Sequence, residues 1–274
     1  MTSSARMAAA FQRAKDAGRP ALIGFVIPGY PTLEDSQDAF DAMVEGGADV
    51  VEVEIPFSDP LADGATIQAA VFRALENGAT PASCIEFVRT ARARHPDMPI
   101  VIMTYLNPVL AYGIEAFAAT ASAAGTDGML MVDLPAEEAG EARAAFARHG
   151  MDTVFLVAPT STDERIEMIG KLASGFVYCV SVTGVTGARR DLPPGLEEFV
   201  ERVRRCTAIP IAVGFGMSRR EHIEALTGVV DGVVIGSAFI DLLGKPAAAG
   251  KTEPGERAKR LREYVEVLSG RRSP

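Results

Sequence analysis

The sequence predicts an α/β fold, a (β/α)8 TIM barrel, from three observations. Short runs rich in Val and Ile alternate with longer runs rich in Ala, Glu and Arg, as in successive strand and helix units around a parallel sheet. Eight such units can be counted along the chain. The length of 274 residues is close to the roughly 250 that this barrel usually takes. An open doubly wound sheet is the alternative, but the first turn, Pro28-Gly29-Tyr30-Pro31, lacks the glycine fingerprint of dinucleotide-binding sheets.

Each expected strand is a short apolar run that ends at turn-forming or polar residues. In chain order the expected strands are Ala21–Ile27, Val50–Ile55, Ile100–Thr104, Gly128–Val132, Thr153–Val157, Phe176–Val180, Ile209–Val213 and Gly232–Ile235. A helical pattern follows each of them, which completes eight units.

Further segments account for the remaining length. An extra N-terminal helix is expected at Ser4–Ala17. Two helical runs, Thr66–Asn77 and Pro81–His95, lie between the second and third strands, so one of them is an extra helix. The last helix is expected at Glu256–Ser269, after a surface connection at Lys245–Gly255 that is rich in Ala, Pro and Gly.

Composition limits the possible classes of function. The chain is 48% hydrophobic and 23% charged, and we expect residues 1–274 to form a single barrel domain. The net charge of −9 argues against a nucleic-acid partner, which would need a basic face. No apolar run approaches the ~18 residues of a membrane span. The N-terminus lacks an apolar core followed by a cleavage site, so a cytoplasmic protein is expected.

The cysteines and histidines give no sign of a metal site or of a nucleophile. The cysteines form no CxxC pair, so we expect small buried residues rather than a zinc site or a disulfide framework. They are Cys84, Cys179 and Cys206. The histidines have no Ser or Cys nucleophile motif nearby and are expected on the surface. They are His95, His149 and His222.

The second expected strand places carboxylates where a barrel would bury them. Glu52 and Glu54 share one face of the strand because side chains alternate, and Asp59 and Asp63 follow in the loop. An unpaired ionised carboxylate costs several kcal/mol to bury. Structural interpretations remain open: Glu52 could belong to a buried hydrogen-bond network, and Asp63 could cap the helix that begins near Thr66.

Glycine-rich turns follow the last three strands. They read Thr183-Gly184-Val185-Thr186-Gly187, Gly214-Phe215-Gly216 and Gly236-Ser237. Glycines let backbone N–H groups approach an anion, and a serine at a helix start adds a hydroxyl and the positive end of the helix dipole. Any one of these glycines could merely permit a tight turn, but three such loops at one barrel end favour a phosphate site.

These motifs resemble one known family over nearly the whole chain. The segment Pro56-Phe57-Ser58-Asp59-Pro60-Leu61-Ala62-Asp63-Gly64, preceded by Glu52, is similar to the signature of the tryptophan synthase alpha chain. The similarity continues, in the family's order and spacing, through Gly46-Gly47-Ala48-Asp49, Met103-Thr104-Tyr105-Leu106-Asn107-Pro108, Asp133-Leu134-Pro135, Gly184-Val185-Thr186-Gly187, Gly214-Phe215-Gly216 and Gly236-Ser237-Ala238.

The resemblance implies a lyase that cleaves indole-3-glycerol phosphate to indole and glyceraldehyde 3-phosphate, in a retro-aldol reaction without metal or organic cofactor. Glu52 matches the family's catalytic acid and base. Asp63 matches the aspartate that holds the indole N–H. Tyr178 matches a tyrosine near the glycerol portion, and Thr186 matches a threonine on a mobile loop that meets Asp63 on closure.

The resemblance also implies binding residues and a partner. Phosphate contacts are expected from Gly187, Gly216, Gly236 and Ser237, and the indole pocket is expected to be lined by Phe25, Tyr105 and Phe215, with Gly214 beside them. The family works with a beta chain that carries pyridoxal phosphate, usually as an α2β2 complex, and passes indole to it. Asp59 and the segment Tyr105–Tyr112 resemble the docking surface.

One departure from the family pattern concerns the acidic strand itself. Glu54 stands where the family usually has Gly, and we expect Glu52 and Glu54 to titrate as a unit. Ala65 replaces a usual Pro, and the turn at 27–31 is also varied. Two alternatives therefore remain: a stand-alone lyase of specialised metabolism, and a catalytically weakened barrel that serves as an allosteric partner subunit.

Overall fold

The structure, a computed structural model, describes residues 5–180, 194–214, 216–245 and 255–273. Within them, eight parallel strands pair in chain order, and β8 pairs with β1 to close the barrel. The strands are β1 (Ala21–Val26), β2 (Val50–Glu54), β3 (Ile100–Thr104), β4 (Gly128–Met131), β5 (Asp152–Val157), β6 (Val177–Val180), β7 (Ile211–Gly214) and β8 (Gly232–Ile235). The predicted (β/α)8 barrel is confirmed.

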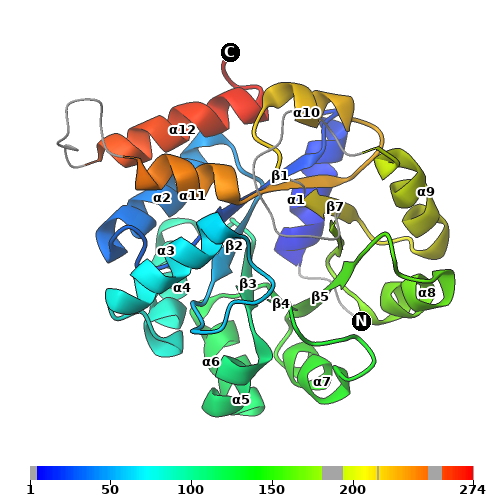
Figure 1. The fold of residues 1–274 in the computed structure, drawn as a ribbon, viewed down its shortest axis with the longest axis horizontal. Helices are drawn as coiled ribbons and strands as arrows, with labels where there is room; N and C mark the ends of the chain where they lie inside the picture. Colours follow the sequence, from blue (N-terminus) through cyan, green and yellow to red (C-terminus); the bar gives the residue numbers. More distant parts are fainter. Residues whose placement is uncertain (1–4, 181–193, 215, 246–254, 274) are drawn as a thin grey trace.

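Helices surround the strands, as Figure 1 shows. They are α1 (Ala5–Asp16), α2 (Leu33–Gly46), α3 (Ala65–Glu76), α4 (Pro81–Arg94), α5 (Leu106–Tyr112), α6 (Ile114–Ala124), α7 (Gly140–Arg148), α8 (Asp163–Leu172), α9 (Leu196–Cys206), α10 (Arg220–Ala225), α11 (Ser237–Gly244) and α12 (Glu256–Ser269). The extra N-terminal helix is α1, as predicted. Both α3 and α4 lie between β2 and β3, so one of them is the second predicted extra helix. The short helix α5 is an addition that the sequence did not predict.

Two details of the chain path follow from local chemistry. β7 begins at Ile211 rather than at Ile209, because the intervening Pro210 has no N–H for the strand ladder. The helix α5 begins after Tyr105, where the Asp133 carboxylate accepts the Leu106 N–H at 2.7 Å. Most of the expected connection at 245–255 lies outside the described residues.

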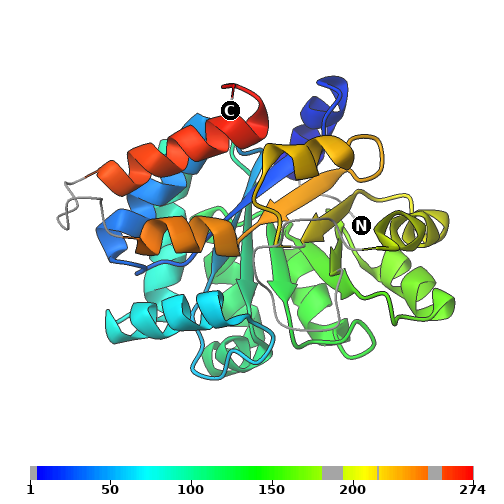
Figure 2. The ribbon, with the colours of Figure 1, turned by 45° about the horizontal axis from the view of Figure 1, so that its top comes forward.

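The core has an inner and an outer layer. Inside the barrel, residues such as Ile23, Val101 and Phe176 pack with Met7 and Phe11 of α1, so that α1 closes the N-terminal end. Between strands and helices lies a larger apolar layer. The last helix, α12, packs against α2 and α11, and the three lie side by side in both views (Figures 1 and 2).

Three aspartates repeat one device at the N-terminal end of the barrel. Each precedes a strand, accepts a backbone N–H from the neighbouring strand and pairs with at least one arginine. The sets are Asp49 with Leu22 and Arg19, Asp127 with Ile100, Arg6 and Arg92, and Asp231 with Ile211 and Arg204. These hydrogen bonds and ion pairs hold neighbouring strands in register at the N-terminal end of the barrel. The active site of such a barrel is expected at the opposite, C-terminal end.

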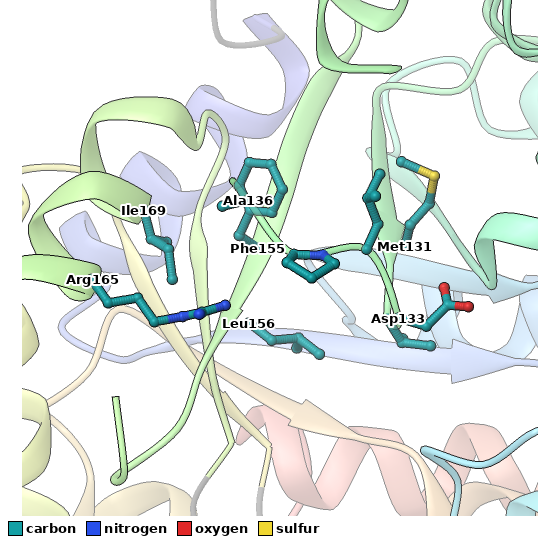
Figure 3. A pocket seen from close by; sticks show the side chains of 10 residues that line it. Met131, Asp133, Ala136, Phe155, Leu156, Arg165 and Ile169 are labelled. Carbon is teal, nitrogen blue, oxygen red and sulfur yellow. The ribbon is translucent and has the colours of Figure 1, made fainter. Parts of the chain in front are cut away.

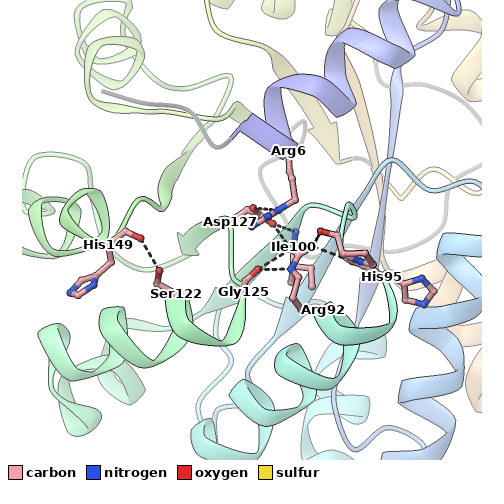
Figure 4. A network of polar contacts seen from close by, with 9 residues as sticks. Arg6, Arg92, His95, Ile100, Ser122, Gly125, Asp127 and His149 are labelled. Atoms are coloured by element: carbon pink, nitrogen blue, oxygen red, sulfur yellow. Dashed lines mark hydrogen bonds and ion pairs between the residues drawn. The ribbon is translucent and has the colours of Figure 1, made fainter.

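Asp127 is the most buried of these three carboxylates. Its oxygens accept from Arg6 Nε at 2.8 Å, Arg92 Nη2 at 2.7 Å and the Ile100 N–H at 2.8 Å (Figure 4). Arg92 Nη2 also donates to the Gly125 carbonyl at 2.8 Å. A carboxylate that is 2% exposed is therefore matched by charged and backbone donors, as a buried ion requires. In the described part of the chain, no helix is long and apolar enough to cross a membrane.

Candidate active site

β2 directs two acids into the barrel. Val51 and Val53 belong to the layer between strands and helices, whereas Val50 belongs to the inner cluster. Since side chains alternate along a strand, Glu52 and Glu54 face the interior with Val50. The exposed fractions of these two residues are 1% and 0%. The prediction that both acids share one face is confirmed, and that face is the inside of the barrel.

Glu52 has no hydrogen-bond partner for either carboxyl oxygen among the described residues. It lies between Phe25 of β1 and Val101 of β3 in the strand register. Burial raises the pKa of its carboxyl from 4.5 to about 8. The interpretation of Glu52 as part of a buried hydrogen-bond network is therefore wrong for the part of the chain described. A buried acid with unused oxygens and a pKa near neutrality is suited to exchange protons with a ligand.

Asp63 is held by an aromatic side chain that directly follows the next strand, β3. The Tyr105 hydroxyl donates to Asp63 Oδ2 at 2.7 Å, and it accepts the Ala62 N–H at 3.0 Å. The Phe57 ring lies 5.4 Å from the Tyr105 ring, centroid to centroid. The interpretation of Asp63 as a helix cap is wrong, because Gly64 occupies the cap position of α3 and no side chain caps it. Tyr105 instead fixes the aspartate at the barrel mouth.

Glu54 is a second neighbour of Asp63. The two carboxyl groups lie within hydrogen-bonding reach of each other. Burial, then the Asp63 charge and contact, and then Glu52 raise the pKa of Glu54 well above its usual range. Burial also raises the pKa of Asp63, against the hydrogen bonds from Tyr105 and Glu54, which lower it. The expected Glu52–Glu54 unit is thus corrected, because Glu54 interacts more strongly with Asp63 and burial alone shifts Glu52.

Tyr178 approaches these acids from β6. Burial raises the pKa of its hydroxyl first, and the Glu52 and Asp63 charges raise it further, although the residue as a whole is only half-buried. Gly214 of β7 lies directly beside it, and a Cβ at Gly214 would overlap the Tyr178 hydroxyl. Gly214 therefore provides space for Tyr178. Of the three residues predicted to be catalytic, Tyr178 is thus within range of the charges of both Glu52 and Asp63.

The remaining predicted binding residues lie at the ends of β1, β7 and β8. Phe25 is 4% exposed, and a Cβ at Gly236 would contact its ring at 3.5 Å. Ser237 begins α11 and is buried, and Gly216 has a φ of 65°, which a residue with a side chain rarely adopts. A helix start beside a glycine turn can bind an anion. The other predicted residues, Thr186, Gly187 and Phe215, lie outside the described residues.

Comparison with known proteins is decisive about the family. The family model for the tryptophan synthase alpha chain matches residues 11–269. The chain belongs to this family. A tryptophan synthase alpha chain from Roseiflexus castenholzii is 47% identical over 265 residues, which cover 97% of this chain and 99% of the relative. One from Solibacter usitatus is 45% identical over 248 residues, or 90% of this chain and 92% of the relative.

Solved structures agree with the family. A chain in the tryptophan synthase of Mycobacterium tuberculosis superposes with a TM-score of 0.87 at 37% identity, covering 97% of this chain and 98% of that one. A chain in the tryptophan synthase a2b2 complex of Pyrococcus furiosus superposes with a TM-score of 0.84 at 40% identity, covering 92% and 98%. The barrel and the strand ends described above are therefore those of a tryptophan synthase alpha chain.

The inner wall at the mouth includes apolar residues that the sequence interpretation missed. Met103, Val132 and Leu156 are half-buried and pack on the inner cluster beside Tyr178. Each lies two positions after an inward residue of its strand, so alternation could have identified them. Val132 and Leu156 also border a cavity of about 170 Å³ at the ends of β4 and β5, with Asp133 and Arg165 on opposite sides (Figure 3).

The expected surface positions of the histidines are partly wrong. His222 is only 7% exposed, because α10 turns it toward the protein. His95 pairs with Asp41 at 2.7 Å, and His149 pairs with Glu115 at 2.9 Å, both half-buried. Of the cysteines, Cys84 and Cys179 are buried as expected, whereas Cys206 is only partly buried. Across the described residues, no three His, Cys, Asp or Glu side chains are grouped as metal ligands.

Proposed function

We propose that the chain cleaves indole-3-glycerol phosphate to indole and glyceraldehyde 3-phosphate, the alpha reaction of tryptophan synthase. The family supports the reaction, and one observation supports the site. Glu52 is a buried acid with a pKa of about 8 and no partner among the described residues, and its charge acts on Tyr178 together with that of Asp63. Such a group can both give and take a proton near neutral pH.

In the proposed mechanism Glu52 moves two protons. Its carboxylic acid first protonates the ring carbon of the indole that bears the glycerol chain. The resulting carboxylate then takes the proton of the adjacent glycerol hydroxyl. The bond between the ring and the chain breaks, its electrons restore the aromatic ring, and the hydroxyl carbon becomes the aldehyde. Glu52 ends protonated, as it began.

Asp63 would accept the indole N–H and so stabilise the positive charge that ring protonation creates. Tyr105 fixes the aspartate for this role through the hydrogen bond at 2.7 Å. Tyr178, within range of the Glu52 and Asp63 charges, would face the glycerol portion. Phe25 would contact the indole ring. The N–H groups at Gly216, Gly236 and Ser237, with Gly187 and Thr186 from the sixth loop, would hold the phosphate and close the site.

The proposed reaction moves only protons and electron pairs between side chains and substrate, so it requires no metal or organic cofactor of this chain. Pyridoxal phosphate would be needed only in a beta chain. We propose an α2β2 assembly with such a chain, in the cytoplasm. The similar Pyrococcus furiosus structure is an a2b2 complex. Each of the two segments expected to dock carries an exposed apolar side chain: Leu61, at 87%, two positions after Asp59, and Leu110, at 52%, on α5.

The test is an indole assay with purified protein, with and without a beta chain. We expect indole formation that increases when the beta chain is added. Glu52→Gln should abolish turnover but leave binding of indole-3-glycerol phosphate measurable. Glu201→Gln, on the exposed side of α9, is the matched control and should keep full activity. An absence of indole under both conditions would refute the proposal, and high turnover without beta-chain binding would indicate a stand-alone lyase.

A further inference from the structure

Glu54 is the acid for which the proposed reaction has no role. It is 0% exposed and points into the barrel mouth from β2. Neither of its oxygens receives a hydrogen bond from an N–H or O–H group of the described residues. The group within its reach is the Asp63 carboxyl, which is 5% exposed. Two buried acids therefore lie within hydrogen-bonding reach of each other in a space nearly closed to water.

This contact requires a proton. An ionised carboxylate has only acceptor atoms, so two carboxylates in contact repel each other and cannot form a hydrogen bond. None of the ion pairs among the described residues brings a Lys, Arg or His to Glu52, Glu54 or Asp63. With no such cation among the described residues, one member of the buried acid pair keeps its proton and donates it to the other.

The surroundings decide which carboxyl is ionised. Asp63 accepts the Tyr105 hydroxyl at 2.7 Å, which stabilises its anion. Among the described residues Glu54 has no equivalent donor, and the Asp63 and Glu52 charges both disfavour its ionisation. In the described part of the chain, the other titratable groups whose pKa the Glu54 charge shifts are Tyr105 and Cys84 of α4, and both are neutral near pH 7. The proton therefore belongs on Glu54 and the negative charge on Asp63.

We propose that Glu54 is a positioning residue: it holds a proton in the resting enzyme and donates it to Asp63, so that the Asp63 carboxylate is aimed to accept the indole N–H. The role of Asp63 toward indole rests on the proposed function, whereas the shared proton does not. With Glu52 also protonated at neutral pH, three buried acids carry one negative charge. This limits repulsion of a phosphorylated substrate.

Infrared difference spectroscopy tests the proton directly. Glu52→Gln serves as the background, because it removes the other protonated glutamate and stops turnover. At neutral pH we expect its spectrum to contain a carboxylic-acid carbonyl band that disappears when Glu54→Gln is added. Labelling glutamate carboxyl groups with carbon-13 should shift this band. The proposal is overturned if the band survives Glu54→Gln or if no such band is present. It is also overturned if the label does not move the band, because the proton would then be on Asp63.

Binding of indole-3-glycerol phosphate tests the positioning role. In the Glu52→Gln background, Glu54→Gln should change Kd less than about threefold, because the amide still donates to Asp63. Glu54→Leu has similar size but no donor, and it should weaken binding about tenfold or more. Equal affinities for the Gln and Leu variants would refute positioning. The infrared result does not depend on lyase activity, so failure of this proposal and failure of the proposed function can be told apart.

Discussion

Replacing Glu52 by Gln should stabilise the folded protein, by an amount that increases with pH. The buried carboxyl has a pKa of about 8 in the folded chain, against 4.5 in an exposed reference state. Between these values the folded protein retains a proton that the unfolded chain releases, so folding stability falls as pH rises. Gln has the same shape as the protonated acid and does not titrate. The variant is therefore free of this loss.

The magnitude follows from the size of the shift. One pKa unit corresponds to about 1.36 kcal/mol, so the wild-type chain loses about 3 kcal/mol by pH 7 and about 5 kcal/mol above pH 8. The loss is absent below pH 4.5, where both states bind the proton. The difference in unfolding free energy between Glu52→Gln and wild type should therefore be near zero in acid, about 3 kcal/mol at pH 7 and about 5 kcal/mol above pH 8.

Urea unfolding of both proteins at about pH 4, 7 and 9 measures this difference, since the slope with urea reports whether the unfolded states are comparable. Glu201→Gln, exposed on α9, should show no such rise with pH. A difference between Glu52→Gln and wild type that stays constant from acid to alkaline pH would refute the reasoning. It would mean that the folded protein accommodates an ionised Glu52.

Two further perturbations test how the two barrel ends are built. Tyr105→Phe removes the hydroxyl that donates to Asp63 at 2.7 Å. Steady-state kinetics should show kcat/KM lowered roughly 10- to 100-fold, because a hydrogen bond to a charged group is lost. An unchanged kcat/KM would contradict the role of Tyr105 in fixing Asp63. Asp127→Asn weakens the pairing with Arg6 and Arg92, and thermal and urea unfolding should show a loss of about 3 kcal/mol. Lyase activity of the folded Asp127 variant should be retained, because the residue lies at the opposite end of the barrel, and a selective loss of activity would argue against that separation.

The barrel and the location of its site could be predicted from sequence because both depend on local periodicity. Strand alternation was sufficient to place Glu52 and Glu54 on one face, and their position at the carboxyl end of β2 was sufficient to place them at the mouth. The predicted bounds of β3 and β8 coincide with the observed ones. The short helix α5 was missed because its seven residues offer too little periodic signal.

By itself, the sequence determined the eight-unit barrel, the family and the acids that point inward. Only the tertiary structure decided how those acids are paired. The Asp63 carboxyl meets Glu54 and Tyr105, which lie 9 positions before it and 42 positions after it in the chain. Such contacts depend on the path of the β2–α3 loop and on barrel closure, which periodicity does not encode. The same holds for the burial of His222 and for the Asp127 cluster, where partners from α1, α4 and β3 meet only after folding.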